Sequence, residues 1–214
     1  MPSPLPLLFL SFLCHSMLTA DETKRPPPGR LSLVALEENR GLDPQRLRLV
    51  AIALQTVQRF NFNRYLYGSA DPSKKAFDCS GAIYYLLRLV DLQPPRSSSA
   101  QYDWIRKAGN LVLVPKDTTS IDAAIFDKLN PGDLIFWSGT YKPRDGRTNG
   151  VTHVQMYIGR ERKDALRVMV GSSDGRSYRG TARCGFGIFD LKLPRAGSKA
   201  RLVAFGTPPG LIKP

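Results

Sequence analysis

The sequence predicts an α+β fold, in which helices from the first half of the chain pack on an antiparallel β-sheet from the second half. Two observations support this prediction. Between residues 43 and 128, apolar residues recur at helical spacing in several segments. From residue 133 onward, the apolar segments are short, rich in Val, Ile and Phe, and separated by turn residues, as is typical of strands. Helices followed by strands favour an α+β fold.

The 214 residues suffice for one domain with its own core. Residues 1–20 carry no charged side chain, have an apolar centre and end in the small residue Ala20, so we interpret them as an export signal, with a disordered apolar leader as the alternative. Residues 21–40 begin with a proline-rich stretch and are predicted to be a linker or N-terminal extension, and residues 41–214 the folded domain. The apolar run is too short for a transmembrane helix, so we expect an exported protein of the periplasm, extracellular space or cell wall.

The helices begin and end at recognisable signals. Asp43 and Pro44 form an N-cap followed by proline at the first helical position. A second helix is predicted to begin near Cys79 and to end before Pro94. The four predicted helices cover residues 43–60, 79–90, 99–107 and 120–128.

The strands of the second half follow a two-residue alternation. In the segment VTHVQMYIG, this alternation places His153 and Val154 on opposite faces of the sheet. The charged segment GRERKDAL, which follows it, is interpreted as a solvated loop. The five predicted strands cover residues 133–137, 151–159, 165–172, 185–191 and 200–206.

The chain is strongly basic, with 31 Lys and Arg against 18 Asp and Glu and a formal charge of +13. Such a surface attracts polyanions. The basic residues are scattered and form no nucleic-acid-binding motif, so we expect no specific nucleic-acid partner. Outside the cytoplasm, the available polyanions are cell-wall polymers and lipid head groups, and the expected partner of this surface is an anionic cell-wall polymer.

Cys79 and His153 are the candidate catalytic residues. A cysteine at a helix start is expected to have a lowered pKa, because free backbone N–H groups and the helix dipole favour the thiolate. His153 is the one histidine outside the leader, and an imidazole that takes the thiol proton and returns it to the leaving group gives a cysteine hydrolase.

The alternatives are that Cys79 is a small buried hydrophobe and His153 a polar residue of a strand face. A disulfide between Cys79 and Cys184 stays open. Because the chain has one histidine outside the leader and no close Cys/His cluster, we expect neither a metal nor an organic cofactor.

Four segments in order resemble the NlpC-type family (NlpC/P60) of bacterial cell-wall cysteine peptidases, which have a papain-like α+β fold. The nucleophile and histidine segments together are the specific part of this resemblance. The matching segments are FNRYLYGS (62–69), FDCSGAIYY (77–85), LNPGDLIFW (129–137) and HVQMYIG (153–159).

The resemblance implies hydrolysis of an amide bond in the peptide stem of peptidoglycan, between D-glutamate and diaminopimelate or lysine. It implies that Cys79 is the nucleophile and that His153 is the general base and then the acid. It also implies that Tyr65 lies near the oxyanion site and that Asp78 and Ser80 recognise the amino end of the substrate. The alternative roles are a core aromatic for Tyr65 and a plain helix N-cap for Asp78.

The chain departs from the family at the third polar residue, which orients the imidazole. That position falls at Val170, which cannot accept a hydrogen bond. Ser172, on the same strand face, is the predicted replacement, with Asp174 or a backbone carbonyl behind it.

This departure leaves other functions open. A non-catalytic cell-wall-binding module with the same fold is one alternative, and a related papain-like hydrolase of another amide or of an ester is a second. We expect the protein to be a monomer.

Overall fold

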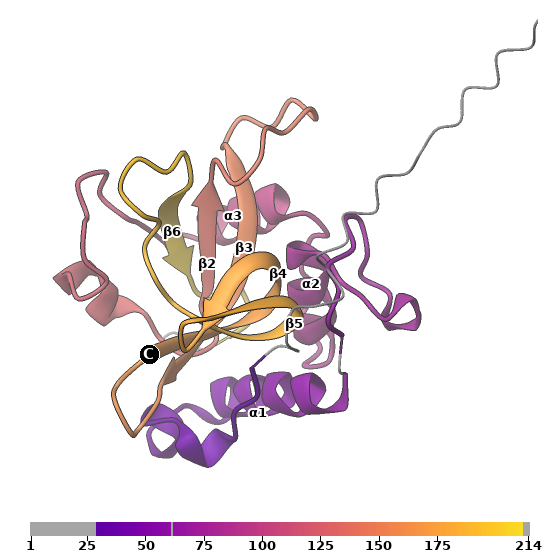
Figure 1. Cartoon of the computed structure of the whole chain (residues 1–214), viewed down its shortest axis with the longest axis vertical. Helices are drawn as coiled ribbons and strands as arrows, with labels where there is room; N and C mark the ends of the chain where they lie inside the picture. The colour runs from indigo at the N-terminus through magenta and orange to yellow at the C-terminus, as the bar shows by residue number, and fades with distance from the viewer. Residues whose placement is uncertain (1–28, 61, 212–214) are drawn as a thin grey trace, which may run out of the picture.

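The computed structural model describes residues 29–60 and 62–211, so the predicted export signal lies outside the described residues. Helices from the first half of this part of the chain pack on an antiparallel sheet built from the second half (Figure 1). This confirms the predicted α+β class. In the described part of the chain, no helix is both long and apolar enough to span a membrane.

Each α-helix begins at a residue whose side chain caps it. The side chains of Asp43, Asp78 and Ser97 accept hydrogen bonds from backbone N–H groups in the first turn of the helix that follows. The α-helices are α1 (Pro44–Arg59), α2 (Cys79–Arg88) and α3 (Ser98–Lys107). The helix predicted over residues 120–128 is instead a short 3₁₀ helix, Ala124–Lys128, which suits the short connection into the next strand.

The six strands of the described residues form one sheet in the order β1-β6-β2-β3-β4-β5. The sequence did not predict β1, which has three residues and pairs only with β6. The hairpin formed by the fourth and fifth strands is longer than predicted, since residues 173–178 pair with residues 181–185. The prediction stopped short because residues 173–178 are polar and rich in turn formers. The strands are β1 (Leu111–Leu113), β2 (Leu134–Ser138), β3 (Val151–Arg160), β4 (Arg167–Tyr178), β5 (Thr181–Asp190) and β6 (Arg201–Gly206).

The two faces of the sheet carry separate apolar clusters. Val154 of β3 packs with the residues of α1 and α2, whereas Trp137 of β2 and Tyr157 of β3 belong to the cluster on the other face. This confirms the predicted alternation along β3, which places His153 on the face away from Val154.

The described part of the predicted linker, residues 29–40, packs on the domain. Leu36 is fully buried and bridges to Glu161, and Gly29 bridges to Ile188 of β5. Glu161 is itself buried, and its carboxylate accepts hydrogen bonds from Tyr178 and Arg179. The segment 159–166 is therefore exposed at residues 162–165 but not at Glu161, so the interpretation of the whole segment as a solvated loop is wrong.

Candidate active site

Cys79 is the first residue of α2 and is 5% exposed. Its sulfur accepts hydrogen bonds from the Tyr65 hydroxyl and from the backbone N–H groups of Ser80 and Val154. Cys79 and Cys184 are not joined to each other by a disulfide. The thiol therefore lies between the start of α2 and the strand that carries His153.

Burial raises the pKa of the Cys79 thiol, and the negative charge of Asp78 raises it further. The hydrogen bonds to the sulfur lower the pKa, but by less than burial raises it. The sequence-based expectation of a lowered pKa is therefore wrong, because the cost of burying a thiolate exceeds the benefit of the helix start. The thiol is neutral at neutral pH.

This raised pKa predicts how Cys79 reacts with iodoacetamide. Since the thiolate is the reactive form, we expect the labelling rate to be low at neutral pH. The rate should increase only when the pH exceeds the ordinary pKa of a thiol. Peptide mass mapping measures the rate at Cys79 itself, because the chain has three cysteines. Rapid labelling of Cys79 below neutral pH would contradict this expectation.

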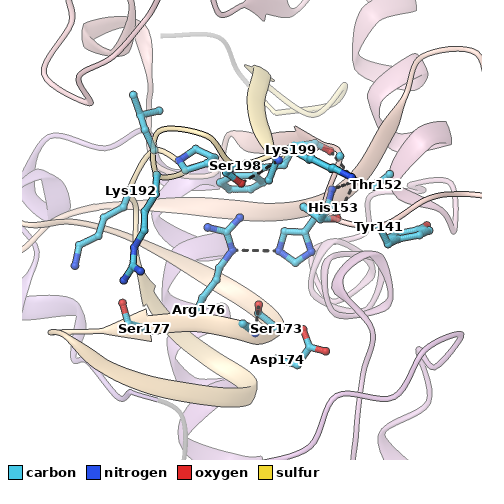
Figure 2. Close-up of a pocket in the computed structure, with 18 of the residues that line it drawn as sticks. Tyr141, Thr152, His153, Ser173, Asp174, Arg176, Ser177, Lys192, Ser198 and Lys199 are labelled. Carbon is cyan, nitrogen blue, oxygen red and sulfur yellow. Dashed lines mark hydrogen bonds between the residues drawn. The ribbon is translucent and has the colours of Figure 1, made fainter.

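His153 is 8% exposed, and its imidazole packs beside the ring of Trp137, with 5.5 Å between the ring centroids. Its hydrogen-bond partner is Arg176 of β4, whose Nε donates to Nε2 of His153 at 3.3 Å (Figure 2). Because Nε2 accepts this bond, the proton of the neutral ring lies on Nδ1. Burial and the Arg176 charge lower the pKa of His153 well below its ordinary value, so the ring is neutral at neutral pH.

Cys79 and His153 line two neighbouring cavities. Cys79 lines a cavity of about 230 Å³, and His153 lines one of about 1090 Å³. The two cavities share walls formed by Tyr65, Tyr67, Tyr141 and Thr152. Within the described residues no hydrogen bond joins the thiol to the imidazole, and the sulfur instead meets the backbone of Val154, one residue after His153. Their pairing as nucleophile and base stays a prediction.

Tyr65 lies beside the nucleophile. Its hydroxyl accepts a hydrogen bond from the Cys79 backbone N–H at 3.4 Å and donates one to the Cys79 sulfur. Burial and the neighbouring Cys79 raise the pKa of this hydroxyl, so it keeps its proton. A protonated hydroxyl and a backbone N–H at one point are the donors that an oxyanion site needs.

Asp78 is the N-cap of α2 and also the centre of a polar network. Its carboxylate accepts hydrogen bonds from the backbone N–H groups of Gly68 and Gly81 and from the Ser80 hydroxyl. Arg96 forms an ion pair with Asp78 at 2.8 Å and donates to Ser80 at 3.0 Å. An amino group of a substrate that binds Asp78 would therefore have to displace Arg96. The sequence did not predict this arginine at the site.

Ser172 is fully buried and donates to the backbone carbonyl of Phe77 at 2.8 Å. It therefore braces the segment before Cys79, while Arg176 makes the hydrogen bond to His153. Val170 is buried in the apolar cluster, and Asp174 lies at the wall of the larger cavity. Among residues 29–60 and 62–211, no group of three His, Cys, Asp or Glu side chains is placed to hold a metal ion.

The NlpC/P60 family model matches residues 63–172 of this chain, which include Tyr65, Cys79 and His153. The chain belongs to the NlpC/P60 family. This confirms the resemblance of the four sequence segments.

Relatives of this NlpC/P60 chain include the gamma-DL-glutamyl hydrolase of Bacillus subtilis, which is 26% identical over 107 residues, or 50% of this chain. The match spans 20% of that relative's length. Solved structures include the peptidoglycan hydrolase RipB of Mycobacterium tuberculosis, at 20% identity over 78% of this chain and 69% of that one, with a TM-score of 0.42. Another is an NlpC/P60 endopeptidase of Photobacterium damselae, at 13% identity over 76% and 39% of the two chains, with a TM-score of 0.47.

Two arginines distinguish this NlpC/P60 chain from the expectations that its motifs raised. Arg176 donates a hydrogen bond to the His153 imidazole, where a third polar residue was expected to accept one. Arg96 forms an ion pair with the carboxylate of Asp78. Both arginines lie at cavity walls. The site therefore combines a neutral thiol and a neutral imidazole with two cations beside them.

Proposed function

We propose that this NlpC/P60 protein is an exported cysteine peptidase that hydrolyses an amide bond in the peptide stem of peptidoglycan. The observation that carries the proposal is the position of the Cys79 sulfur, which lies against the Tyr65 hydroxyl and the backbone of Val154, next to His153. The name of the Bacillus subtilis relative specifies a γ-glutamyl bond. A glutamyl amide, between D-glutamate and diaminopimelate or lysine, is therefore the bond that we propose.

The mechanism begins from the neutral thiol. His153 takes the thiol proton as the sulfur attacks the carbonyl carbon, so that the S–C bond forms and the oxygen becomes an oxyanion. The Cys79 N–H and the Tyr65 hydroxyl stabilise this oxyanion. The imidazolium then gives its proton to the leaving nitrogen as the C–N bond breaks. Water, deprotonated by His153, attacks the thioester carbonyl. The S–C bond then breaks, the acid leaves, and the imidazolium returns its proton to the Cys79 sulfur.

The charge of the chain fits this substrate and location. A formal charge of +13 holds the protein on an anionic cell wall. Export itself rests on the apolar, uncharged segment of residues 1–20. As part of the proposal, Asp78 and Ser80 contact the substrate from the smaller cavity, together with Arg96.

Digestion of defined muropeptides tests the proposed activity. We expect the purified protein to release new amino termini, and mass spectrometry of the products to place the cut after D-glutamate. Binding of muropeptides without any products would favour the cell-wall-binding module instead. Two observations keep that second candidate in view, namely the raised pKa of Cys79 and the Arg176 cation on His153. Cleavage at a different bond would reassign the substrate while keeping the hydrolase.

A further inference from the structure

The larger cavity beside His153 has a cationic lining. It lies where the start of β3, with Thr152 and His153, meets the β4–β5 hairpin and the segment that follows β5 (Figure 2). Two carboxylates, Asp174 and Asp190, also line it, and Asp190 is already paired with Lys192 at 2.7 Å. The cations of the lining are Arg176, Lys192, Arg195 and Lys199.

Arg176 is the cation of this lining that contacts His153. Its guanidinium carbon lies 4.0 Å from the centroid of the Trp137 ring, and its Nε donates to His153. No carboxylate of the described residues pairs with it, and its terminal N–H groups have no acceptor among these residues. Burial lowers the pKa of Arg176 to about 10, as expected for a cation that lacks a neighbouring anion.

A half-buried guanidinium with free N–H groups and no counter-ion is suited to an anionic ligand. Its planar N–H groups match the two oxygens of a carboxylate, and such charge-assisted pairs are the strong hydrogen bonds of proteins. The cavity volume of about 1090 Å³ leaves room for several residues of a peptide.

We propose that this cavity binds a carboxylate of the substrate, that Arg176 is its receptor, and that this contact controls the hydrogen bond between Arg176 and His153. The ligand class, an acidic glutamyl peptide, rests on the proposed function. Arg176 is then both a binding residue and a positioning residue for the imidazole.

The hydrogen bond explains why this contact matters. While Arg176 donates to Nε2, the ring proton is held on Nδ1, and the guanidinium charge opposes formation of the imidazolium. A carboxylate on Arg176 neutralises that charge and competes for the guanidinium. Arg176 is the charged group that acts on the ring, since β2 contributes Trp137 and α2 the neutral Cys79 thiol. Substrate binding thereby makes His153 a better proton acceptor.

The test compares two probes that differ in one group, L-alanyl-D-glutamate γ-methylamide (the acid), whose one carboxylate is the α-carboxylate, and its α-carboxamide (the amide), which has no carboxylate. Binding to the full chain with Cys79→Ala, which prevents turnover, is measured by calorimetry, and the His153 ring is titrated by NMR. We expect the acid to bind about tenfold more tightly than the amide or better. We also expect the acid, but not the amide, to raise the pKa of His153.

Three variants assign the effect to Arg176. Arg176→Met should abolish the preference for the acid and raise the pKa of His153 without any probe, whereas Arg176→Lys should keep a reduced preference. Arg144→Met removes the same charge from an exposed loop outside both cavities and should change neither quantity. Unfolding curves show whether each variant is folded, and the lysine variant keeps the test valid if Arg176→Met is not.

Equal binding of acid and amide, or an acid preference that survives Arg176→Met, would overturn the inference. The proposed function and the role of Arg176 are contradicted by different results. Muropeptide turnover by the wild type without any acid preference removes only the role of Arg176. An acid preference without turnover keeps the carboxylate site and removes the hydrolase.

Discussion

Cys79→Ala is expected to reduce the release of amino termini from muropeptides by about 10⁴-fold or more, because removing a nucleophile leaves only binding and oxyanion stabilisation. The fold should survive, since the change deletes one sulfur from a site whose hydrogen bonds come mainly from backbone groups and Tyr65. The rate is measured by derivatising the new amino groups.

Cys184→Ala is the matched control for this variant. Cys184 is also a buried cysteine, but it lies in β5 and lines neither cavity. We expect this variant to retain wild-type turnover. If Cys79→Ala kept its activity, or if both substitutions reduced turnover equally, Cys79 would not be the nucleophile.

Arg46→Met is expected to lower the free energy of unfolding by about 3–5 kcal/mol, because it leaves a buried carboxylate without its partner. Arg46 lies on α1 with 1% of its surface exposed. It forms an ion pair with Asp133 at 3.0 Å and donates to the Thr207 hydroxyl and the Pro131 carbonyl, both at 2.8 Å. One side chain thus ties α1 to the start of β2 and to the residue after β6. Urea unfolding measures the change.

Arg48→Met provides the comparison from the same helix. Arg48 pairs with Asp91 at 3.4 Å, and both side chains are mainly exposed, so the loss should be at most about 1 kcal/mol. A loss for Arg46→Met no larger than that for Arg48→Met would show that the buried pair does not stabilise the fold.

The sequence predicted those parts of the fold that local signals determine. Asp43 with Pro44, and Asp78 before Cys79, mark the helix starts that the structure shows. Strand β3 was predicted within a residue of its end, because its two-residue alternation is regular. β1 was missed because three residues carry no period, and its formation depends on pairing with β6.

The two arginines of the site could not be predicted from local signals. Arg176 is 23 residues from His153, and Arg96 is 18 residues from Asp78, so each contact depends on how distant segments pack. Register shifts in the β2–β3, β3–β4 and β4–β5 pairs also change which side chains face each other, and no periodicity records them. Arg176 lies beyond the strand end that was predicted at residue 172.

The protonation states of Cys79 and His153 could not be predicted from the sequence either. The helix start at Cys79 was visible, but its effect on the pKa competes with burial, and burial depends on the packing of α2 against β3. The same holds for His153, whose neutral state follows from burial and from a cation on another strand.

Intact-mass measurement of the wild-type protein, quenched during muropeptide turnover, shows whether Cys79 forms a covalent acyl-enzyme. We predict a covalent adduct with the mass of the acyl half of the substrate, located by peptide mapping on Cys79 and absent from Cys79→Ala. His153→Ala should form this adduct far more slowly. Steady release of amino termini with no adduct on Cys79, or an adduct on any other residue, would show that Cys79 is not the nucleophile.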